Sequence, residues 1–109
     1  MNMRRSGSLR HRVHLESATK TPDGGGGSLV VWEEAAALWV AIKPLSGREM
    51  FSAGQFSSRL THQITLRYRT PVLPEMRFRK GSRIFQIKSV LDVDERGCWL
   101  QALCEEREL

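Results

Sequence analysis

The sequence predicts a mainly β fold: a small antiparallel β-barrel or sandwich with one short α-helix and a long glycine-rich loop. Three observations predict it. Apolar and polar residues alternate with a period of two in several short segments, turn-forming residues separate these segments, and 109 residues suit one domain. Closing the sheet on itself is economical for so small a domain, because closure removes exposed strand edges.

The N-terminal third contains two expected strands. Apolar and polar side chains alternate over Leu9–Leu15, which predicts the first strand. Residues 17–28 include four consecutive glycines and no large apolar side chain, which predicts a flexible glycine-rich loop. Residues 33–37 are expected to form a short helical turn. Residues 38–44 are expected to form a strand that ends at Pro44.

The expected helix covers residues 46–58. Ser46 is a suitable N-cap, and Glu49, three residues later, completes a capping-box pattern. The remaining chain alternates again between strands and turns, and its last turn is the hairpin at 94–97. Strands are expected at Thr61–Thr70, Met76–Arg79, Arg83–Asp94 and Cys98–Glu105.

Positive charge is unevenly distributed along the chain. The net charge is +5, and residues 1–8 form a basic N-terminus that is expected to be flexible. Arg67 and Arg69 have a spacing of two that Arg77 and Arg79 repeat. If their strands are neighbours, four guanidinium groups share one surface that suits DNA phosphates or an acidic protein. The plainer interpretation is a solvated basic face that keeps the protein soluble.

The sequence lacks the spacings that enzymes and cofactor sites need. Its histidines and cysteines form no Cys-x-x-Cys or His-x-x-x-His pair, so no metal, no cofactor and no enzymatic activity are expected. The glycine run lacks the Gly-Lys-Ser/Thr of a phosphate-binding loop. Cys98 and Cys104 are expected to be small buried side chains. No apolar run approaches the ~20 residues of a membrane-spanning helix, and no secretory signal is apparent, so synthesis in the cytoplasm is expected.

Two segments carry a resemblance to a known family. They are PLSGRE at residues 44–49 and THQITLRYR at residues 61–69, and they occur in an order that extends over residues 8–106. In this order the chain resembles the head–tail joining (head-closure, or stopper) proteins of long-tailed bacteriophages and phage-like gene transfer agents. The resemblance implies a location in the virion or phage-like particle, at the neck between head and tail, after synthesis in the bacterial cytoplasm.

The resemblance also implies partners. It implies a homo-oligomeric ring, for which six-fold symmetry is favoured and twelve-fold symmetry is the alternative, with an adaptor or portal-side protein above and a tail terminator or tail tube protein below. Double-stranded DNA would pass through the ring, and a loop would close the channel after packaging. The candidate gating loop consists of Thr19, Lys20, Thr21, Pro22, Asp23, Gly24, Gly25, Gly26, Gly27 and Ser28. Candidate subunit, partner or DNA contacts are Arg48, Glu49, Arg67, Arg69, Arg77 and Arg79.

Two alternatives stay open. One is a small basic β-barrel that binds nucleic acid, and the other is a different ring of the same neck, an adaptor or a tail terminator. Stacking of bases would need aromatic side chains on the basic face. Strand phasing instead directs Tyr68 and Phe78 to the face opposite the arginines, which favours the connector.

Overall fold

The computed structural model describes residues 9–46, 60–68 and 71–108. Apart from Ser46, the expected helix at 46–58 lies outside the described residues, as do Arg48, Glu49, Arg69 and the basic residues 1–8. The described part contains six strands and one short 3-10 turn at Val93–Glu95. The strands are β1 (His11–Pro22), β2 (Ser28–Pro44), β3 (His62–Arg67), β4 (Arg77–Lys80), β5 (Arg83–Asp92) and β6 (Trp99–Glu108).

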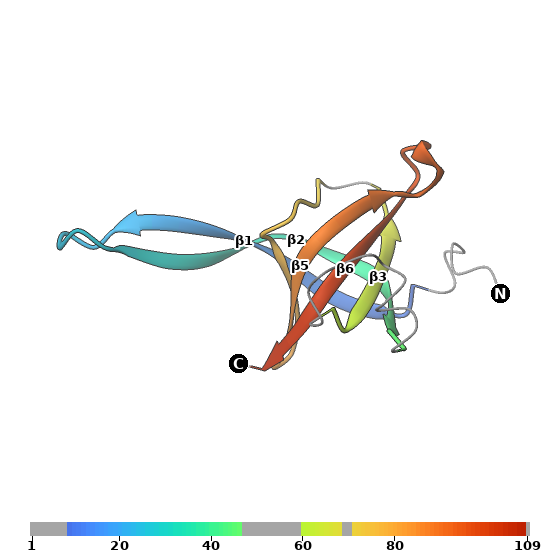
Figure 1. The fold of residues 1–109 in the computed structure, drawn as a ribbon, viewed down its shortest axis with the longest axis horizontal. Helices are drawn as coiled ribbons and strands as arrows, with labels where there is room; N and C mark the ends of the chain where they lie inside the picture. The colour runs from blue at the N-terminus through green and yellow to red at the C-terminus, as the bar shows by residue number, and fades with distance from the viewer. Residues whose placement is uncertain (1–8, 47–59, 69–70, 109) are drawn as a thin grey trace.

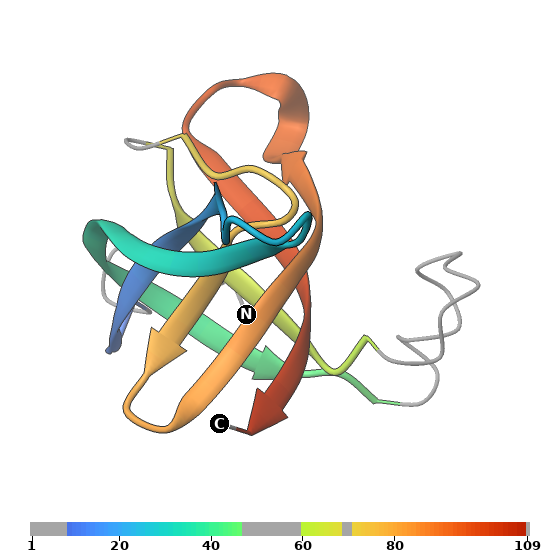
Figure 2. The ribbon, with the colours of Figure 1, turned by 90° about the vertical axis from the view of Figure 1, so that its left-hand side faces the viewer.

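The six strands form a closed antiparallel barrel. Their order around the barrel is β1-β2-β3-β6-β5-β4, and a short pairing of β1 with β4 closes it. Figure 2 shows the strands arranged around a common interior. This closure confirms the expected mainly β, antiparallel barrel. A tight turn that contains Gly81, with a φ of +61°, joins β4 to β5.

The barrel interior is filled by the apolar side of each strand. Phe78 lies opposite both Leu15 and Phe85, so two aromatic rings and a leucine meet where β1, β4 and β5 adjoin. These three side chains are fully buried. Burying a large apolar side chain contributes about 2 kcal/mol, which makes this layer a principal source of stability. Other core residues are Val13, Val40, Ile64, Leu66, Val72, Ile87, Leu100, Ala102 and Cys104.

An arm projects from the barrel. Beyond the barrel wall, β1 and β2 pair only with each other, and together they form a two-stranded ribbon (Figure 1). We call this ribbon, residues 17–34, the arm. The molecule extends 52 × 29 × 27 Å, so the arm nearly doubles one dimension.

The arm corrects two expectations. Residues 17–22 and Ser28 are strand rather than loop, and the turn is confined to 23–27. Residues 33–37 are also strand, within β2, rather than a helical turn. The cause is cross-strand pairing: Thr19 lies opposite Val31, and β-branched residues favour a strand wherever a partner strand is available. Sequence periodicity shows no such partner.

Candidate functional site

The tip of the arm is an ordered turn around Asp23. The Asp23 carboxylate accepts hydrogen bonds from the backbone N–H of Gly25 at 2.8 Å and of Gly27 at 3.1 Å. Gly24 and Gly26 have φ of +86° and +88°, a region that L side chains rarely adopt. A Cβ on Gly27 would lie 2.7 Å from an Asp23 carboxylate oxygen. These glycines therefore allow one defined turn conformation at the tip of the arm.

The root of the arm is held to the barrel by a group that we call the clasp: Glu16, Arg77, Arg79 and Trp32. Arg77 Nε donates to one Glu16 carboxylate oxygen at 2.7 Å, and Arg79 Nε donates to the other at 2.9 Å. The Arg77 guanidinium also lies over the Trp32 ring, 4.0 Å from its centroid. Arg77 thus joins β4 of the barrel to both strands of the arm.

The charge of Glu16 is maintained by these arginines. Only 6% of Glu16 is exposed. Burial works to raise the pKa of its carboxyl group, but the hydrogen bonds from Arg77 and Arg79 outweigh burial and hold the pKa below the usual 4.5. The clasp is therefore a charged, ionised contact at neutral pH.

A second feature lies on the outer wall of the barrel, and we call it the Arg–Trp row: Arg12, Trp39, Arg67 and Trp99. Arg12 lies opposite Trp39, with its guanidinium 5.5 Å from the ring centroid. Arg67 lies opposite Trp99 at 5.0 Å. The β2–β3 pairing ends at Ala41 and Thr65, and Trp39 and Arg67 each lie two residues beyond it on these neighbouring strands. Arginine and tryptophan thus alternate across β1, β2, β3 and β6.

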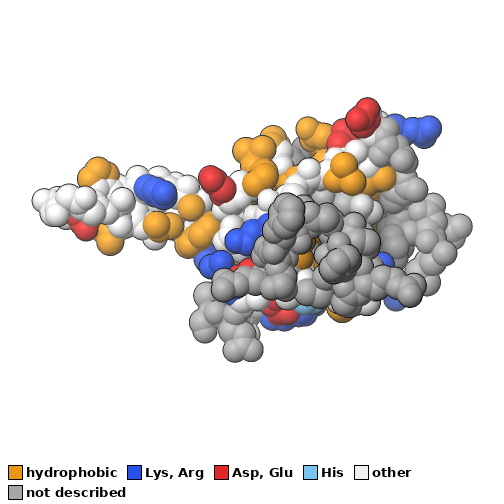
Figure 3. Space-filling model, viewed as in Figure 1, with side chains coloured by type: hydrophobic (Ala, Val, Ile, Leu, Met, Phe, Trp, Pro, Cys, Tyr) orange, Lys and Arg blue, Asp and Glu red, His pale blue; other side chains and the backbone are white. Residues whose placement is uncertain are grey.

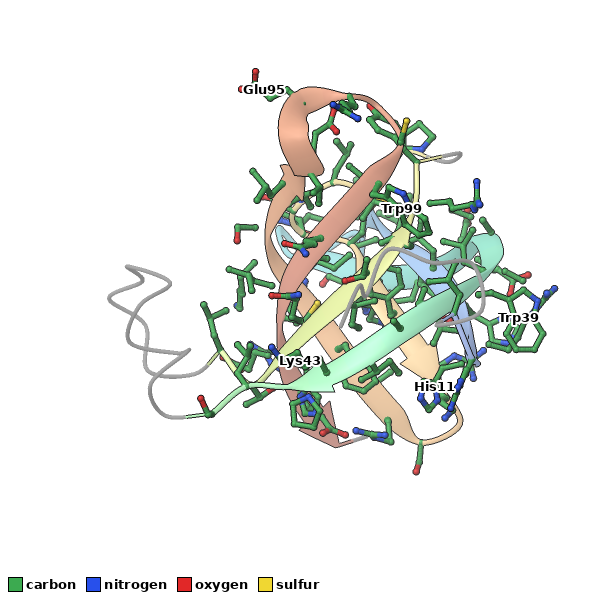
Figure 4. All side chains as sticks on the ribbon, turned by 90° about the vertical axis from the view of Figure 1, so that its right-hand side faces the viewer. His11, Trp39, Lys43, Glu95 and Trp99 are labelled. Atoms are coloured by element: carbon green, nitrogen blue, oxygen red, sulfur yellow. The ribbon has the colours of Figure 1, made fainter. Side chains whose placement is uncertain are left out.

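The row is accessible. Trp39 is 52% exposed, and the neighbouring Val40 and Leu66 point into the core, so the row occupies the outward side of each strand. Figure 4 shows Trp39 and Trp99 on the same side of the barrel, with Trp39 projecting from its surface. Charged guanidinium groups over indole faces keep the rings oriented while one side remains available to solvent.

The expected surface of four arginines does not form. β3 pairs with β2 and β6, whereas β4 pairs with β1 and β5, so Arg67 lies on a different part of the barrel from Arg77 and Arg79. Arg77 and Arg79 do share a side, where they bind Glu16. The phasing of Phe78 into the core is confirmed. The idea that the arginines lack aromatic neighbours is wrong for Arg67 and Arg77, because both lie over tryptophan rings from other strands.

Another polar cluster lies where β3, β5 and β6 meet. Arg83 binds Glu106 through two hydrogen bonds of 2.6 and 3.1 Å, and hydrogen bonding by Arg83 is the main reason that the Glu106 pKa is lowered. His62 lies 3.7 Å from Glu106 and contacts Phe85 edge to face. Burial lowers the pKa of His62. Each of these groups has a structural partner within the barrel.

The described residues offer little for metal or thiol chemistry. Among them, no three His, Cys, Asp or Glu side chains are grouped so as to hold a metal ion. Burial raises the pKa of Cys104 to about 12, which keeps it a neutral thiol, as expected of a buried cysteine. Cys98 is exposed, contrary to expectation. No helix within the described ranges is long and apolar enough to cross a bilayer.

Sequence reasoning identified the tip of the arm but missed the clasp and the Arg–Trp row. Both depend on which residues face each other across strands that are distant in the chain. The only sequence signal was the presence of three tryptophans in a small chain, all of which lie beside arginines in the structure. Without the register, no particular arginine can be assigned to any of them.

Comparison with known proteins gives consistent results. The model of a family described as phage head completion protein matches residues 4–107. One similar solved structure is a chain of the virion of a native gene transfer agent particle, with 33% identity, a TM-score of 0.67, and coverage of 93% of this chain and 97% of that chain. Another is a Shigella flexneri 2a protein determined in solution, with 28% identity, a TM-score of 0.73, and coverage of 97% and 96%. No curated protein sequence matches the chain.

The family match spans almost the whole chain, and the barrel and the arm both lie within it. The expected resemblance to phage and gene transfer agent proteins is therefore confirmed, and with it the expected location in a particle. The chain belongs to the phage head completion protein family and is a component of a phage or gene transfer agent particle.

Proposed function

We propose that this protein is the stopper of the head–tail neck. In this proposal it forms a ring below the portal and its adaptor, closes the DNA channel after packaging, and presents the surface on which tail proteins dock. It carries out no chemical reaction. Six-fold symmetry is proposed for the ring, in keeping with the resemblance seen in the sequence. An adaptor or tail terminator ring of the same neck is the alternative.

The arm is the observation that carries this proposal. A barrel alone fills a ring wall, whereas a ribbon that extends the molecule to 52 Å can reach from the wall into the lumen (Figure 1). Residues 19–28, the candidate gating loop, form the end of this ribbon and its turn. The tip side chains are small, so DNA would meet a narrow obstacle with little surface to adhere to.

The arginines of the barrel have a proposed place in the ring. A ring repeats each positive side chain in every copy, so a weak contact of one copy becomes a strong contact of the whole ring. Arg48, Arg67, Arg69, Arg77 and Arg79, with Glu49, are proposed as contacts to neighbouring copies, partner proteins or DNA. For Arg77 and Arg79 this contact would be made beside their bonds to Glu16.

Deletion of the gene tests the connector role. We expect particles without this protein to consist of heads separated from finished tails, and the heads to lose DNA. Electron microscopy of the particles and nuclease protection of the packaged DNA measure both effects. Normal tailed particles that retain DNA would reject a role in the neck.

Shortening the tip tests the gating role separately. Deleting Gly24–Gly27 removes the turn but leaves the barrel, the clasp and the Arg–Trp row intact. We expect tailed particles to assemble with altered DNA retention or ejection. The matched control is Gly25→Ala, which preserves the turn because its Cβ would meet only Asp23 Oδ1 at 3.6 Å. Unchanged retention and ejection in the deletion would show that another element closes the channel.

A further inference from the structure

We infer that the arm of one copy lies on the Arg–Trp row of the next copy. The contacting side of the arm, which we call the arm strip, consists of Thr19, Thr21, Leu29 and Val31. This inference rests on the proposed ring and adds to it the two surfaces that join neighbouring copies. The end of the arm, residues 23–27, would extend past this contact into the lumen.

The arm strip is apolar and uncovered. Thr21 lies opposite Leu29 and Thr19 opposite Val31, and directly opposite residues point to the same side of a ribbon. Leu29 is 59% exposed and Val31 is 47% exposed. Figure 3 shows hydrophobic side chains along the arm well away from the barrel. A two-stranded ribbon is marginally stable in water by itself, so this arm gains stability when its apolar side is covered.

The Arg–Trp row has the composition of a protein interface. Tryptophan and arginine are the residue types that contribute most binding energy in such contacts, especially where an aromatic ring stays partly exposed before binding. The row crosses four adjacent strands, so a ribbon laid across the barrel would contact its members in succession. Leucine and valine side chains of the arm strip would pack on the indole rings.

Charge and reach favour a second copy of this chain as the occupant. Residues 17–34 carry Lys20 against Asp23, Glu33 and Glu34, whereas the whole chain has a net charge of +5. Glu33, on the same side of the ribbon as Val31, is exposed and suits an arginine of the row. The longest extent of the molecule is 52 Å, against 29 and 27 Å in the other two directions, so the arm reaches beyond the barrel far enough to contact a neighbouring copy (Figure 1).

The arm cannot cover the row of its own chain. It leaves the barrel and points away from it (Figure 1), and the clasp fixes its root in that direction. A contact between an arm and a row is therefore made between copies. Because the two surfaces differ, the contact is head-to-tail, and such contacts close into rings when the rotation between copies permits.

Cross-linking in intact particles tests the inference. Particles are produced with Leu29→Cys in place of the native protein, and a short bis-maleimide is added. The acceptor is the native Cys98, which is exposed beside Trp99, whereas Cys104 is buried and its pKa is about 12. We expect a ladder of covalent oligomers that disappears when Cys98→Ser is added. A second acceptor, Arg12→Cys in the Cys98→Ser background, probes the other end of the row.

Position 30 provides the matched control. Val30 is adjacent to Val31 and similarly exposed at 50%, but it points to the other side of the ribbon together with Lys20. Val30→Cys is expected to cross-link at least about fivefold less than Leu29→Cys, because only the arm strip faces the row. Equal yields from both positions would indicate nonspecific proximity and contradict the inference.

A charge substitution gives an independent readout. Val31→Asp is expected to lower incorporation of the protein into particles at least about fivefold, and Val30→Asp to have a smaller effect. The inference is overturned if tailed particles contain the Leu29→Cys protein but the cross-linker yields only monomers, whether the acceptor is Cys98 or Arg12→Cys. That outcome leaves the stopper proposal unaffected. Normal tailed particles of the wild type that do not contain the native protein overturn both proposals. The variant Trp39→Ala tests DNA as the other occupant. If it abolishes binding of double-stranded DNA while the yield of cross-linked oligomers is unchanged, the row is a DNA-binding surface and the inference is overturned.

Discussion

At the residue scale, the conformation of the arm tip depends on two glycines and one aspartate. Gly24 and Gly26 lie in the left-handed region, where an L side chain is strained by about 1–2 kcal/mol. Asp23 stabilises this turn by accepting hydrogen bonds from two glycine N–H groups. The sequence predicted a flexible loop over residues 17–28, whereas the structure has a specific turn confined to residues 23–27.

Gly26→Ala is expected to loosen the arm without unfolding the barrel. The φ of +88° is strained for alanine, so local opening should become easier by about 1 kcal/mol, which is roughly a fivefold faster amide exchange in the arm. Hydrogen exchange followed by mass spectrometry or NMR measures the amide exchange rates of the arm. Gly25→Ala is the control and should exchange like the native protein. Equal exchange in both variants would mean that the turn does not limit opening of the arm.

At the element scale, the arm is positioned by contacts that only its root makes. The partner strand supplies pairing along the ribbon. At its root, the clasp joins β4 through side chains, and His14–Glu16 of β1 pair with β4 through the backbone. Arg77 is nearly buried, since 16% of its side chain is exposed, whereas 40% of the Arg79 side chain is exposed. The two arginines therefore offer a matched pair with the same carboxylate partner and different burial.

Arg77→Ala is expected to lower the free energy of unfolding by about 2 kcal/mol, because it removes a buried hydrogen-bonded charge and uncovers Trp32. Arg79→Ala should cost less than about 1 kcal/mol, since its side chain is more exposed. Urea unfolding followed by circular dichroism measures both values. A smaller loss for Arg77→Ala than for Arg79→Ala would show that the clasp does not stabilise the arm as described.

Sequence reasoning at this scale found strands better than it found their lengths. The strand expected at Arg83–Asp94 is β5 (Arg83–Asp92), and the strand expected at Met76–Arg79 is β4 (Arg77–Lys80). In both strands, apolar side chains that point into the core alternate with side chains that point outward. The arm strands lack such a side, because no core lies beneath them, and period-two patterning reports burial rather than pairing. Thr19 and Thr21 therefore look like loop residues in the sequence.

At the scale of the whole molecule, stability should depend on pH through two histidines and two carboxylates. Burial lowers the pKa of His11 and of His62, so the unfolded chain takes up protons more readily than the barrel below about 6.5. The pKa of Glu16 and of Glu106 is also lowered from the usual 4.5. Stability should therefore fall in two stages as pH decreases.

We expect the Tm to decrease as the pH falls from about 7.5 to about 5.5, because the histidines are protonated more readily in the unfolded chain. The Tm should decrease again below about pH 4.5, where the carboxylates are protonated. Differential scanning calorimetry across this range measures both stages. The double variant His11→Gln/His62→Gln should flatten the first stage and leave the second unchanged. An equally steep first stage in that variant would assign it to other groups.

The class of this protein could be predicted from the amino-acid sequence: a small antiparallel β domain, a glycine-rich connection between two strands, and an order of segments that resembles the phage and gene transfer agent family. These features follow from local patterning, because alternation and turn residues act over a few neighbours in the chain. The three-dimensional fold was needed to show which strands adjoin, how far β1 and β2 extend as an arm, and which arginine lies over which tryptophan. Some of those contacts join positions more than 60 residues apart, as between Glu16 and Arg77, and closure of the barrel rather than local preference brings them together.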